Sequence, residues 1–282
     1  MSGSYRADFW LIKTDADGNQ VWAKGFGETG MAEGHSVQQT SDGGYILVGG
    51  TYPPGSDSED ILLVKTDAAG NQTWTKTFGW SGNEDGYSVQ QTSDGGYILV
   101  GETDSCGEYA SEVYLIKTDA SGNQVWAKLF GEVEYDYGYS VRQTSDGGFI
   151  VAGFSQNYGG TNTDDVYLIK TDADGNRTWA RRFGGPGTER GRSVQQTSDG
   201  GYIVAGETDP SREGSDDVYL IKTDASGTET WTRTYGGTAN DQGYSVRQTA
   251  EGGYIICGIT ASYGAGQDDV WLIKTDASGN VE

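Results

Sequence analysis

The sequence predicts an all-β protein made of repeated antiparallel units of four strands, with about 52 residues in each unit. One phrase, SVQQTSDGG or a close variant, begins at Ser36, Ser88, Ser140, Ser193 and Ser245. A second phrase, LIKTD or a close variant, places its lysine at Lys13, Lys65, Lys117, Lys170, Lys222 and Lys274. The spacings between these lysines are 52, 52, 53, 52 and 52 residues. No segment shows the 3.6-residue period of a helix, so the repeat is expected to consist of strands alone.

The repeat that begins at Tyr87 shows the four strands in order. YSVQQTS and YILVGET are rich in β-branched and aromatic residues, and the Asp-Gly-Gly between them predicts a hairpin turn. After a variable loop, VYLIKTD and QVWAKLFG form a second predicted hairpin. Its Asp-x-x-Gly-Asn turn suits a type I turn closed by a left-handed glycine. We label the four predicted strands A, B, C and D.

Four-stranded meanders that repeat every 40 to 50 residues are typical of a β-propeller. Five A, five B and five D strands predict five blades in one domain, residues 1–282, with residues 1–6 as an expression remnant or a tail. The six C strands leave one surplus strand, at 8–15 or 269–276. We expect the N- and C-terminal strands to pair and close the ring. The favoured closure takes three strands from the C-terminus and one from the N-terminus. The surplus strand then hangs free, as in a monomer, or pairs with a second molecule in a dimer.

The recurring TSDGGYILVG, TSDGGFIVAG and TAEGGYIICG segments, with LIKTD and the later tryptophan, resemble known repeats. In layout the blades resemble WD-repeat and quinoprotein-type propellers. The tandem SDGGYI…LIKTDxxGNxxW pattern is similar to uncharacterised propeller repeats of bacterial and archaeal surface proteins. That resemblance implies a propeller fold and an extracellular or cell-surface setting. It implies no particular activity.

The composition is strongly acidic, with 19 Lys+Arg against 41 Asp+Glu and a formal net charge of −22. Such a surface repels phosphate backbones and anionic lipids, so nucleic acid is excluded as a partner. The chain shows no apolar stretch long enough to span a membrane and no signal peptide, so membrane insertion is not expected. The charge itself is explained by solubility, by a salty habitat or by cation binding.

The five copies differ mainly in the B–C and D–A loops, which an antiparallel meander places on the face opposite the A–B and C–D turns. We name the loops and strand ends on this side the variable face. Functional surfaces on repeat scaffolds usually lie on such loops, although neutral drift produces the same variation. Aromatic rings beside carboxylates and amides suit sugar recognition. The candidate ligand-binding residues are Tyr52, Trp80, Tyr109, Tyr135, Tyr137, Tyr158 and Tyr263.

Acidic residues recur before strand C and in the D–A loop. Their repetition favours a structural role, such as accepting backbone N–H groups, and the alternative is one Ca²⁺ site per blade. The weak calcium candidates are Asp60, Glu84, Asp136, Asp165, Asp217, Asp241 and Asp269. No cofactor is predicted apart from this calcium alternative.

Strand A is expected to line the central channel, with a variable column at Gln38, Gln90, Arg142, Gln195 and Arg247. This ring offers amides and guanidinium groups for an anion or water, but no pair of acids for glycoside hydrolysis. The single histidine, His35, takes a position that is tyrosine or arginine in the other copies, and is therefore not expected to act as a catalytic base. Cys257 stands where other copies have valine or alanine and is predicted to be buried.

The sequence therefore favours a non-catalytic binding or scaffold module. We expect weak, multivalent, lectin-like recognition of a glycan or of a surface protein through the variable face. The alternative is a purely architectural propeller, either natural, excised from a longer array or engineered. A glycoside-acting enzyme is the third interpretation.

Overall fold

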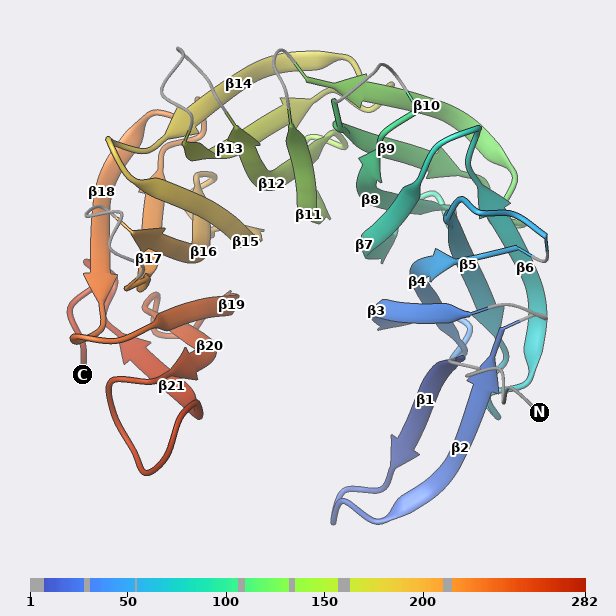
Figure 1. Ribbon diagram of the computed structural model, residues 1–282, viewed down its shortest axis with the longest axis horizontal. Coiled ribbons are helices and arrows are strands. Elements are labelled where there is room, and N and C mark those ends of the chain that lie inside the picture. The colour runs from blue at the N-terminus through green and yellow to red at the C-terminus, as the bar shows by residue number, and fades with distance from the viewer. Residues whose placement is uncertain are drawn as a thin grey trace. The chain divides into compact units, whose positions relative to one another are not determined.

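A computed structural model describes residues 8–27, 31–53, 55–105, 110–131, 135–156, 163–209 and 215–282. Every regular element in these ranges is a β-strand, as the sequence predicts (Figure 1). Within them there is no helix long and apolar enough to cross a membrane.

The four strand types recur along the chain. Strand A is β3 (Ala32–Gln39), β7 (Glu84–Gln91), β11 (Asp136–Gln143), β15 (Thr188–Gln196) and β19 (Asp241–Gln248). Strand B is β4 (Tyr45–Thr51), β8 (Tyr97–Thr103), β12 (Phe149–Gln156), β16 (Tyr202–Asp209) and β20 (Tyr254–Thr260). Strand C is β1 (Phe9–Thr14), β5 (Asp60–Thr66), β9 (Glu112–Thr118), β13 (Asp164–Thr171), β17 (Asp217–Thr223) and β21 (Asp269–Thr275). Strand D is β2 (Gln20–Phe26), β6 (Gln72–Phe78), β10 (Gln124–Phe130), β14 (Arg177–Phe183) and β18 (Glu229–Tyr235).

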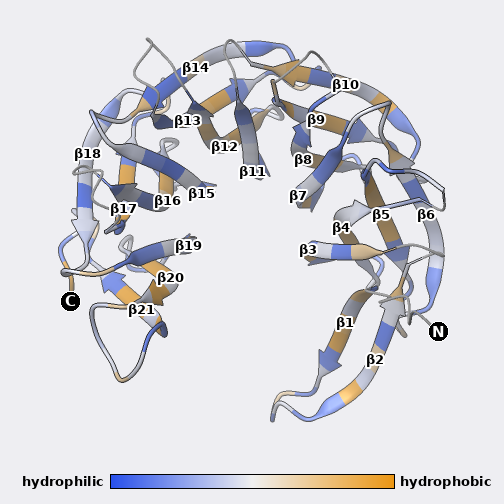
Figure 2. Cartoon of the chain, in the orientation of Figure 1, coloured by the Kyte–Doolittle hydropathy of each residue, from blue (hydrophilic) through white to orange (hydrophobic). Residues whose placement is uncertain are grey.

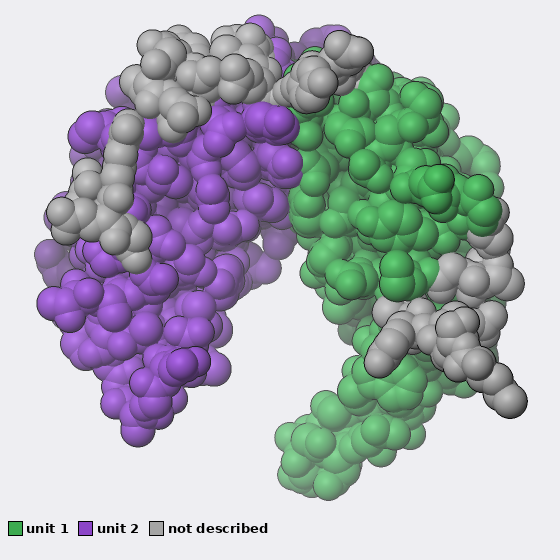
Figure 3. All heavy atoms as spheres, in the orientation of Figure 1, with its two compact units in different colours: residues 1–130 green, residues 131–282 purple. Residues whose placement is uncertain are grey.

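The chain divides into two compact units, residues 1–130 and 131–282 (Figure 3). Unit 1 contains the β1–β2 pair and two four-stranded sheets, β3–β6 and β7–β10. Unit 2 contains the sheets β11–β14 and β15–β18 and the three-stranded sheet β19–β21. All pairings are antiparallel between neighbours in the chain, so the predicted A-B-C-D meander is confirmed. Strand β2 pairs with β1, and β21 pairs with β20.

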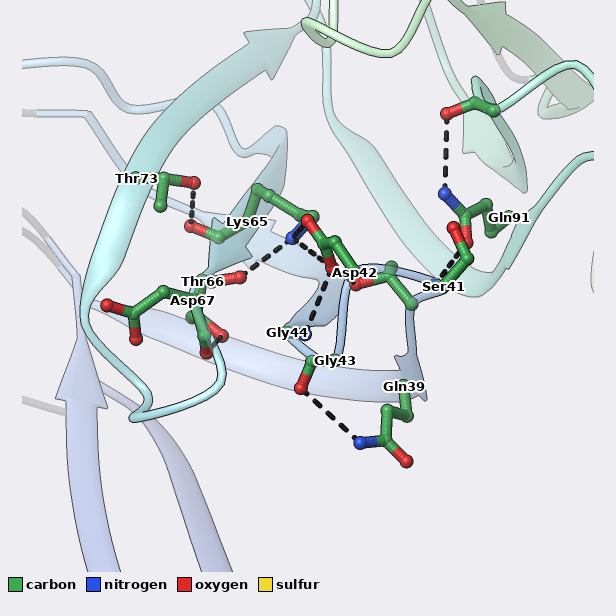
Figure 4. A network of polar contacts seen from close by, with 12 residues as sticks. Gln39, Ser41, Asp42, Gly43, Gly44, Lys65, Thr66, Asp67, Thr73 and Gln91 are labelled. Atoms are coloured by element: carbon green, nitrogen blue, oxygen red, sulfur yellow. Dashed lines mark hydrogen bonds and ion pairs between the residues drawn. The ribbon is translucent and has the colours of Figure 1, made fainter.

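The A–B turn is held by its own side chains and by a buried lysine. In the first sheet, Asp42 accepts hydrogen bonds from the N–H of Gly44 and from Lys65 Nζ, at 3.0 and 2.8 Å (Figure 4). Gly43 has a φ of +84°, the left-handed conformation that favours glycine at this position. The same lysine donates to the carbonyl of Thr66. The repeated Asp-Gly-Gly and Lys-Thr-Asp sequences are thus two halves of one contact, made within each of the four-stranded sheets.

Apolar residues of the B and C strands pack between successive sheets. In unit 1, Ile46 and Leu63 of the first sheet lie in one core cluster with Leu99 and Ile116 of the second. The middle strands β5 and β9 carry hydrophobic colour, whereas β14 and β18 are mostly pale or blue (Figure 2). This follows from burial: β5 and β9 are covered on both faces, whereas most residues of β14 and β18 are exposed or half-buried.

The repeated tryptophan of strand D joins one sheet to the next. Trp74 meets Tyr97 edge-on with ring centroids 5.8 Å apart, and Trp179 meets Tyr202 at the same distance. Trp22–Tyr45 and Trp231–Tyr254 repeat the contact. Edge-to-face aromatic pairs add to the burial energy, so this tryptophan is structural.

The prediction that Cys257 is buried is wrong. Its thiol is exposed, whereas the equivalent Ala205 is fully buried. Ala205 is covered by residues of the following sheet, including Val246 and Ile256. Within the described part of unit 2, no further sheet covers the same face of β20. The repeat position alone therefore does not determine burial.

Candidate functional site

The variable face is built from D–A loops that carboxylates close. Glu84, the first residue of β7, is fully buried and accepts the N–H of Trp80 at 2.9 Å and the hydroxyl of Thr103 at 2.6 Å. In the same way Glu189 accepts the N–H of Gly185, and Asp241 that of Gly237, each at 3.0 Å. A carboxylate that accepts backbone N–H groups stabilises a loop without any ion.

The acidic residue before strand C lies beside the same loop. Asp60 Oδ1 is 2.0 Å from the point where a β-carbon on Gly79 would stand, so Gly79 admits the carboxylate. Asp165 and Asp217 lie equally close to Gly184 and Gly236. Burial, and then the charge of Glu84, raise the pKa of Asp60.

The remaining two calcium candidates also lie at loops of the variable face, Asp136 at a D–A loop and Asp269 at a B–C loop. Asp136 is fully buried at the start of β11, and Asp269 accepts the N–H of Ala265 at 2.9 Å. In the part of the chain that the structure describes, no group of three or more His, Cys, Asp or Glu residues could hold a metal ion. The geometry that is present is that of loop-closing carboxylates.

Two of the aromatic candidates are more than half exposed. Trp80 is 53% exposed, and its indole lies tilted over Tyr114 with centroids 5.0 Å apart. Tyr263 is 52% exposed, with its hydroxyl donating to the carbonyl of Gly236 at 2.8 Å. Because each ring rests on a fixed partner, these side chains present apolar surface with little rotational freedom to lose on binding.

Three further aromatic candidates are less exposed. Tyr137 is half-buried and stacks on Phe154 with centroids 4.7 Å apart and an interplanar angle of 10°. Tyr52 and Tyr135 are also half-buried. Tyr109 and Tyr158 lie outside the described residues. The structure therefore does not bring the five described aromatic candidates into one cluster within either unit.

A group of residues that the sequence reasoning missed lies beside Tyr137, in unit 2. The guanidinium of Arg190 lies 5.1 Å from the Phe154 ring centroid, and its Nη2 is 2.5 Å from Asp164 Oδ2. Arg192 likewise lies over Tyr139, at 4.6 Å, and bonds Glu207 Oε1 at 2.7 Å. Both carboxylates are almost fully buried. The sequence did contain a signal: of the five copies, only this one has arginine at these two repeat positions.

Two glutamines of the predicted channel ring connect neighbouring A strands. Gln38 Oε1 accepts the N–H of Gln91 at 2.6 Å, and Gln195 Oε1 accepts the N–H of Gln248 at 2.9 Å. Arg142 and Arg247 each donate from Nη1 to the carbonyl of the preceding residue, at 2.7 and 3.0 Å. Burial, and then the charge of Arg247, lower the pKa of Arg142 to about 10. Gln90 lies at the same position of β7.

The architecture and these contacts define a protein with a propeller layout. No family model matches the chain. Over the matched region it is 28% identical to the regulatory protein FlaEY of Caulobacter vibrioides, which covers 61% of this chain. The match spans only a fifth of FlaEY, 20% of its length.

Solved propellers share the fold at low sequence identity. The Pan2 WD40 domain of Neurospora crassa has a TM-score of 0.58 at 11% identity, over 89% of this chain and 65% of that one. Sqt1 of Chaetomium thermophilum, solved with the N-terminus of ribosomal protein L10, has a TM-score of 0.56 at 10% identity, over 96% and 67%. A candidate exo-β-1,3-galactanase of Bifidobacterium bifidum s17 has 0.50 at 13%, over 99% and 96%. Since both binding domains and an enzyme candidate share the fold, the site must decide the function.

Proposed function

We propose that this protein is a non-catalytic binding module that recognises a glycan or a protein through its variable face. The observation that carries the proposal is the exposed, braced indole of Trp80. By contrast, the described A–B and C–D turns are filled by contacts within the protein, such as Asp42 with Lys65 and Asp67 with Asn71. Variation and exposed aromatic surface thus occur together on one face, where interaction energy is usually concentrated.

We further propose that the chain forms one ring of five blades, closed by its terminal strands. The apolar side chains Trp10 of β1 and Val270 of β21 are 67% and 83% exposed. Closure of the ring would bury such surface and remove free sheet edges. The surplus C strand, 8–15 or 269–276, then remains free or pairs with a second molecule.

The proposed setting is the cell exterior or the cell surface, in line with the resemblance of the repeats to those of surface proteins. Five related blades would also give avidity toward a target that itself repeats, even if each contact is weak. A purely architectural propeller is the competing interpretation, and the experiment below separates the two.

The test is a glycan array probed with labelled protein, with and without calcium. We expect reproducible hits that Trp80→Ala reduces at least tenfold and that Val125→Ala leaves unchanged. Val125 is a suitable control because it is also exposed, at 61%, but lies on strand D away from the loops. Tyr137→Ala tests the aromatic and arginine group of unit 2, and melting temperatures establish that each variant is folded. A blank array, or hits that survive Trp80→Ala, would overturn glycan recognition through this residue.

A further inference from the structure

One contact recurs between successive sheets on the variable face, but its chemistry changes. It joins the residue at the start of strand C, or just before it, to the second or third residue of strand A in the next sheet. Between the sheets of β13 and β15, Asp164 pairs with Arg190, with Nε and Nη2 at 2.6 and 2.5 Å from Oδ2. Between the sheets of β17 and β19, Asp216 Oδ2 accepts from Gln242 Nε2 at 2.8 Å. An acid therefore meets a hydrogen-bond donor at both places.

The equivalent contact between the first two four-stranded sheets joins two acids, Glu59 and Asp85. Glu59 Oε1 and Asp85 Oδ1 lie 2.0 and 2.9 Å from the point where a β-carbon on Gly50 would stand, so the two carboxyl groups lie close together over this glycine. Asp85 Oδ1 is buried and has no hydrogen-bond partner among the residues that the structure describes. Two ionised carboxylates cannot replace an acid–arginine or acid–amide contact, because neither supplies a donor.

His35 supplies the second half of the contact. Its Nε2 lies 3.0 Å from Asp85 Oδ2, and the His35 side chain is 33% exposed whereas that of Asp85 is 16% exposed. No other described copy has a histidine at this position, since His35 is the only one in the chain. Glu59 and His35 belong to the sheet β3–β6 or its loops, and Asp85 belongs to β7. The Glu59–Asp85 and His35–Asp85 contacts therefore both connect the sheets β3–β6 and β7–β10.

We propose that the carboxyl pair Glu59–Asp85 shares a proton, so that the sheets β3–β6 and β7–β10 are held together at mildly acidic pH and are held more weakly above neutrality. A protonated Glu59 is a hydrogen-bond donor, as Arg190 and Gln242 are at the equivalent contacts between the other sheets. Protonated His35 adds an ion pair to the same aspartate. Loss of both protons leaves Asp85 facing a second carboxylate and a neutral ring.

The electrostatics of the neighbouring groups agree with this arrangement. Burial, and then the charge of Asp85, raise the pKa of Glu59 to about 7. The hydrogen bond to Asp85 raises the pKa of His35 above 6.5. Glu33 of β3 raises both pKa values further, and Tyr52 in the adjoining loop partly offsets the shift of Glu59. On the Asp85 side, the Tyr87 ring lies tilted against His35, and its hydroxyl donates to Glu102 Oε1.

These pKa shifts determine how the stability of the fold changes with pH. A group whose pKa is raised on folding contributes stability that is present below its unfolded value and lost as pH rises through its folded value. Glu59 therefore loses its contribution between about pH 4.5 and 7, and His35 loses its own from pH 6.5 upward.

The experiment compares the melting temperature at pH 5.5 and pH 8 in three variants. We expect the wild type to lose about 3 °C. Asp85→Arg should abolish the loss by copying the Asp164–Arg190 contact, and Glu59→Gln should reduce it by copying the acid–amide contact. Asp216→Asn, which changes the Asp216–Gln242 contact where no second acid is present, should leave the pH dependence of the melting temperature unchanged. An equal loss in wild type and Glu59→Gln would overturn the proposal.

A second measurement needs no variant. Because His35 is the only histidine, its ring protons give a single NMR titration curve. We expect a midpoint above 6.5 and a second inflection near pH 7 from the ionisation of Glu59. One simple transition at or below 6.5 would contradict the shared proton, whatever the stability data show.

Discussion

Replacing Gly206 by alanine is expected to destabilise unit 2 by about 3 kcal/mol. Gly206 of β16 pairs with Gly191 of β15 beside a β-bulge between Gly191 and Ser193. A β-carbon on Gly206 would stand 1.8 Å from the carbonyl oxygen of Arg190. This oxygen is backbone, so only a shift of the strand relieves the overlap. The glycine repeats at Gly49, Gly101, Gly153 and Gly258, each with its β-carbon 1.7 or 1.8 Å from the same kind of carbonyl.

Urea unfolding of the wild type and Gly206→Ala measures this effect. Gly185→Ala is the matched control, because Gly185 lies in the D–A loop that precedes β15 and has no atom within 4 Å of its β-carbon position. We expect that variant to change the free energy of unfolding by less than about 0.5 kcal/mol. If the two variants proved equally stable, the packing of strands A and B described above would be wrong.

The second large effect is expected at the buried lysine. Lys222 is 5% exposed, and its Nζ lies 2.9 Å from Asp199 Oδ2, while the Asp199 side chain is 62% exposed. Removing the exposed partner should therefore cost more than removing the buried one. Asp199→Ala leaves a buried ammonium with the carbonyl of Thr223 as its remaining acceptor, at a cost of about 3 kcal/mol. Lys222→Met leaves a carboxylate that water can solvate, and should cost about 1 kcal/mol.

Equilibrium unfolding at pH 7 gives the order of these two variants, and a larger loss for Lys222→Met would contradict the account. The Asp199–Lys222 contact also weakens at low pH. Partial burial raises the pKa of Asp199, but hydrogen bonds from Thr197 and Lys222 outweigh this and lower it to about 2. Since its pKa falls on folding, Asp199 contributes stability above about pH 4, and that contribution is lost as pH falls toward 2. Asp94 and Asp146 behave alike, each with a pKa of about 2.

The repeat itself predicted most of the fold, because its turn chemistry is local. The turn that ends at Asn123 shows why: Asp119 accepts the N–H groups of Ser121 and Asn123, and Gly122 has a φ of +76°. These contacts lie within five residues and need no tertiary structure. Strand boundaries followed from the same turns, and the apolar B and C strands followed from their continuous hydrophobic sequence.

The site was harder to predict because it depends on contacts between sheets. The sequence placed Tyr137 on the variable face, but not its stacking on Phe154 or the arginine–carboxylate pairs beside it. The His35–Asp85 contact could not be predicted either, because Asp85 is 50 residues away along the chain. Only the alignment of one sheet against the next brings such positions together. Cys257 was misjudged for the same reason, because its burial depends on a following sheet.

Small-angle X-ray scattering of residues 1–282 tests the central structural claim, a single ring of five blades, most directly. A closed, compact chain of this length should have a radius of gyration of about 19 Å. The measurement is made on a monomeric fraction, so that association through the surplus strand does not enter. A value near 19 Å with a scattering profile of a closed ring is the predicted result. A clearly larger radius that persists on dilution would contradict closure, and with it the five-bladed arrangement on which multivalent recognition rests.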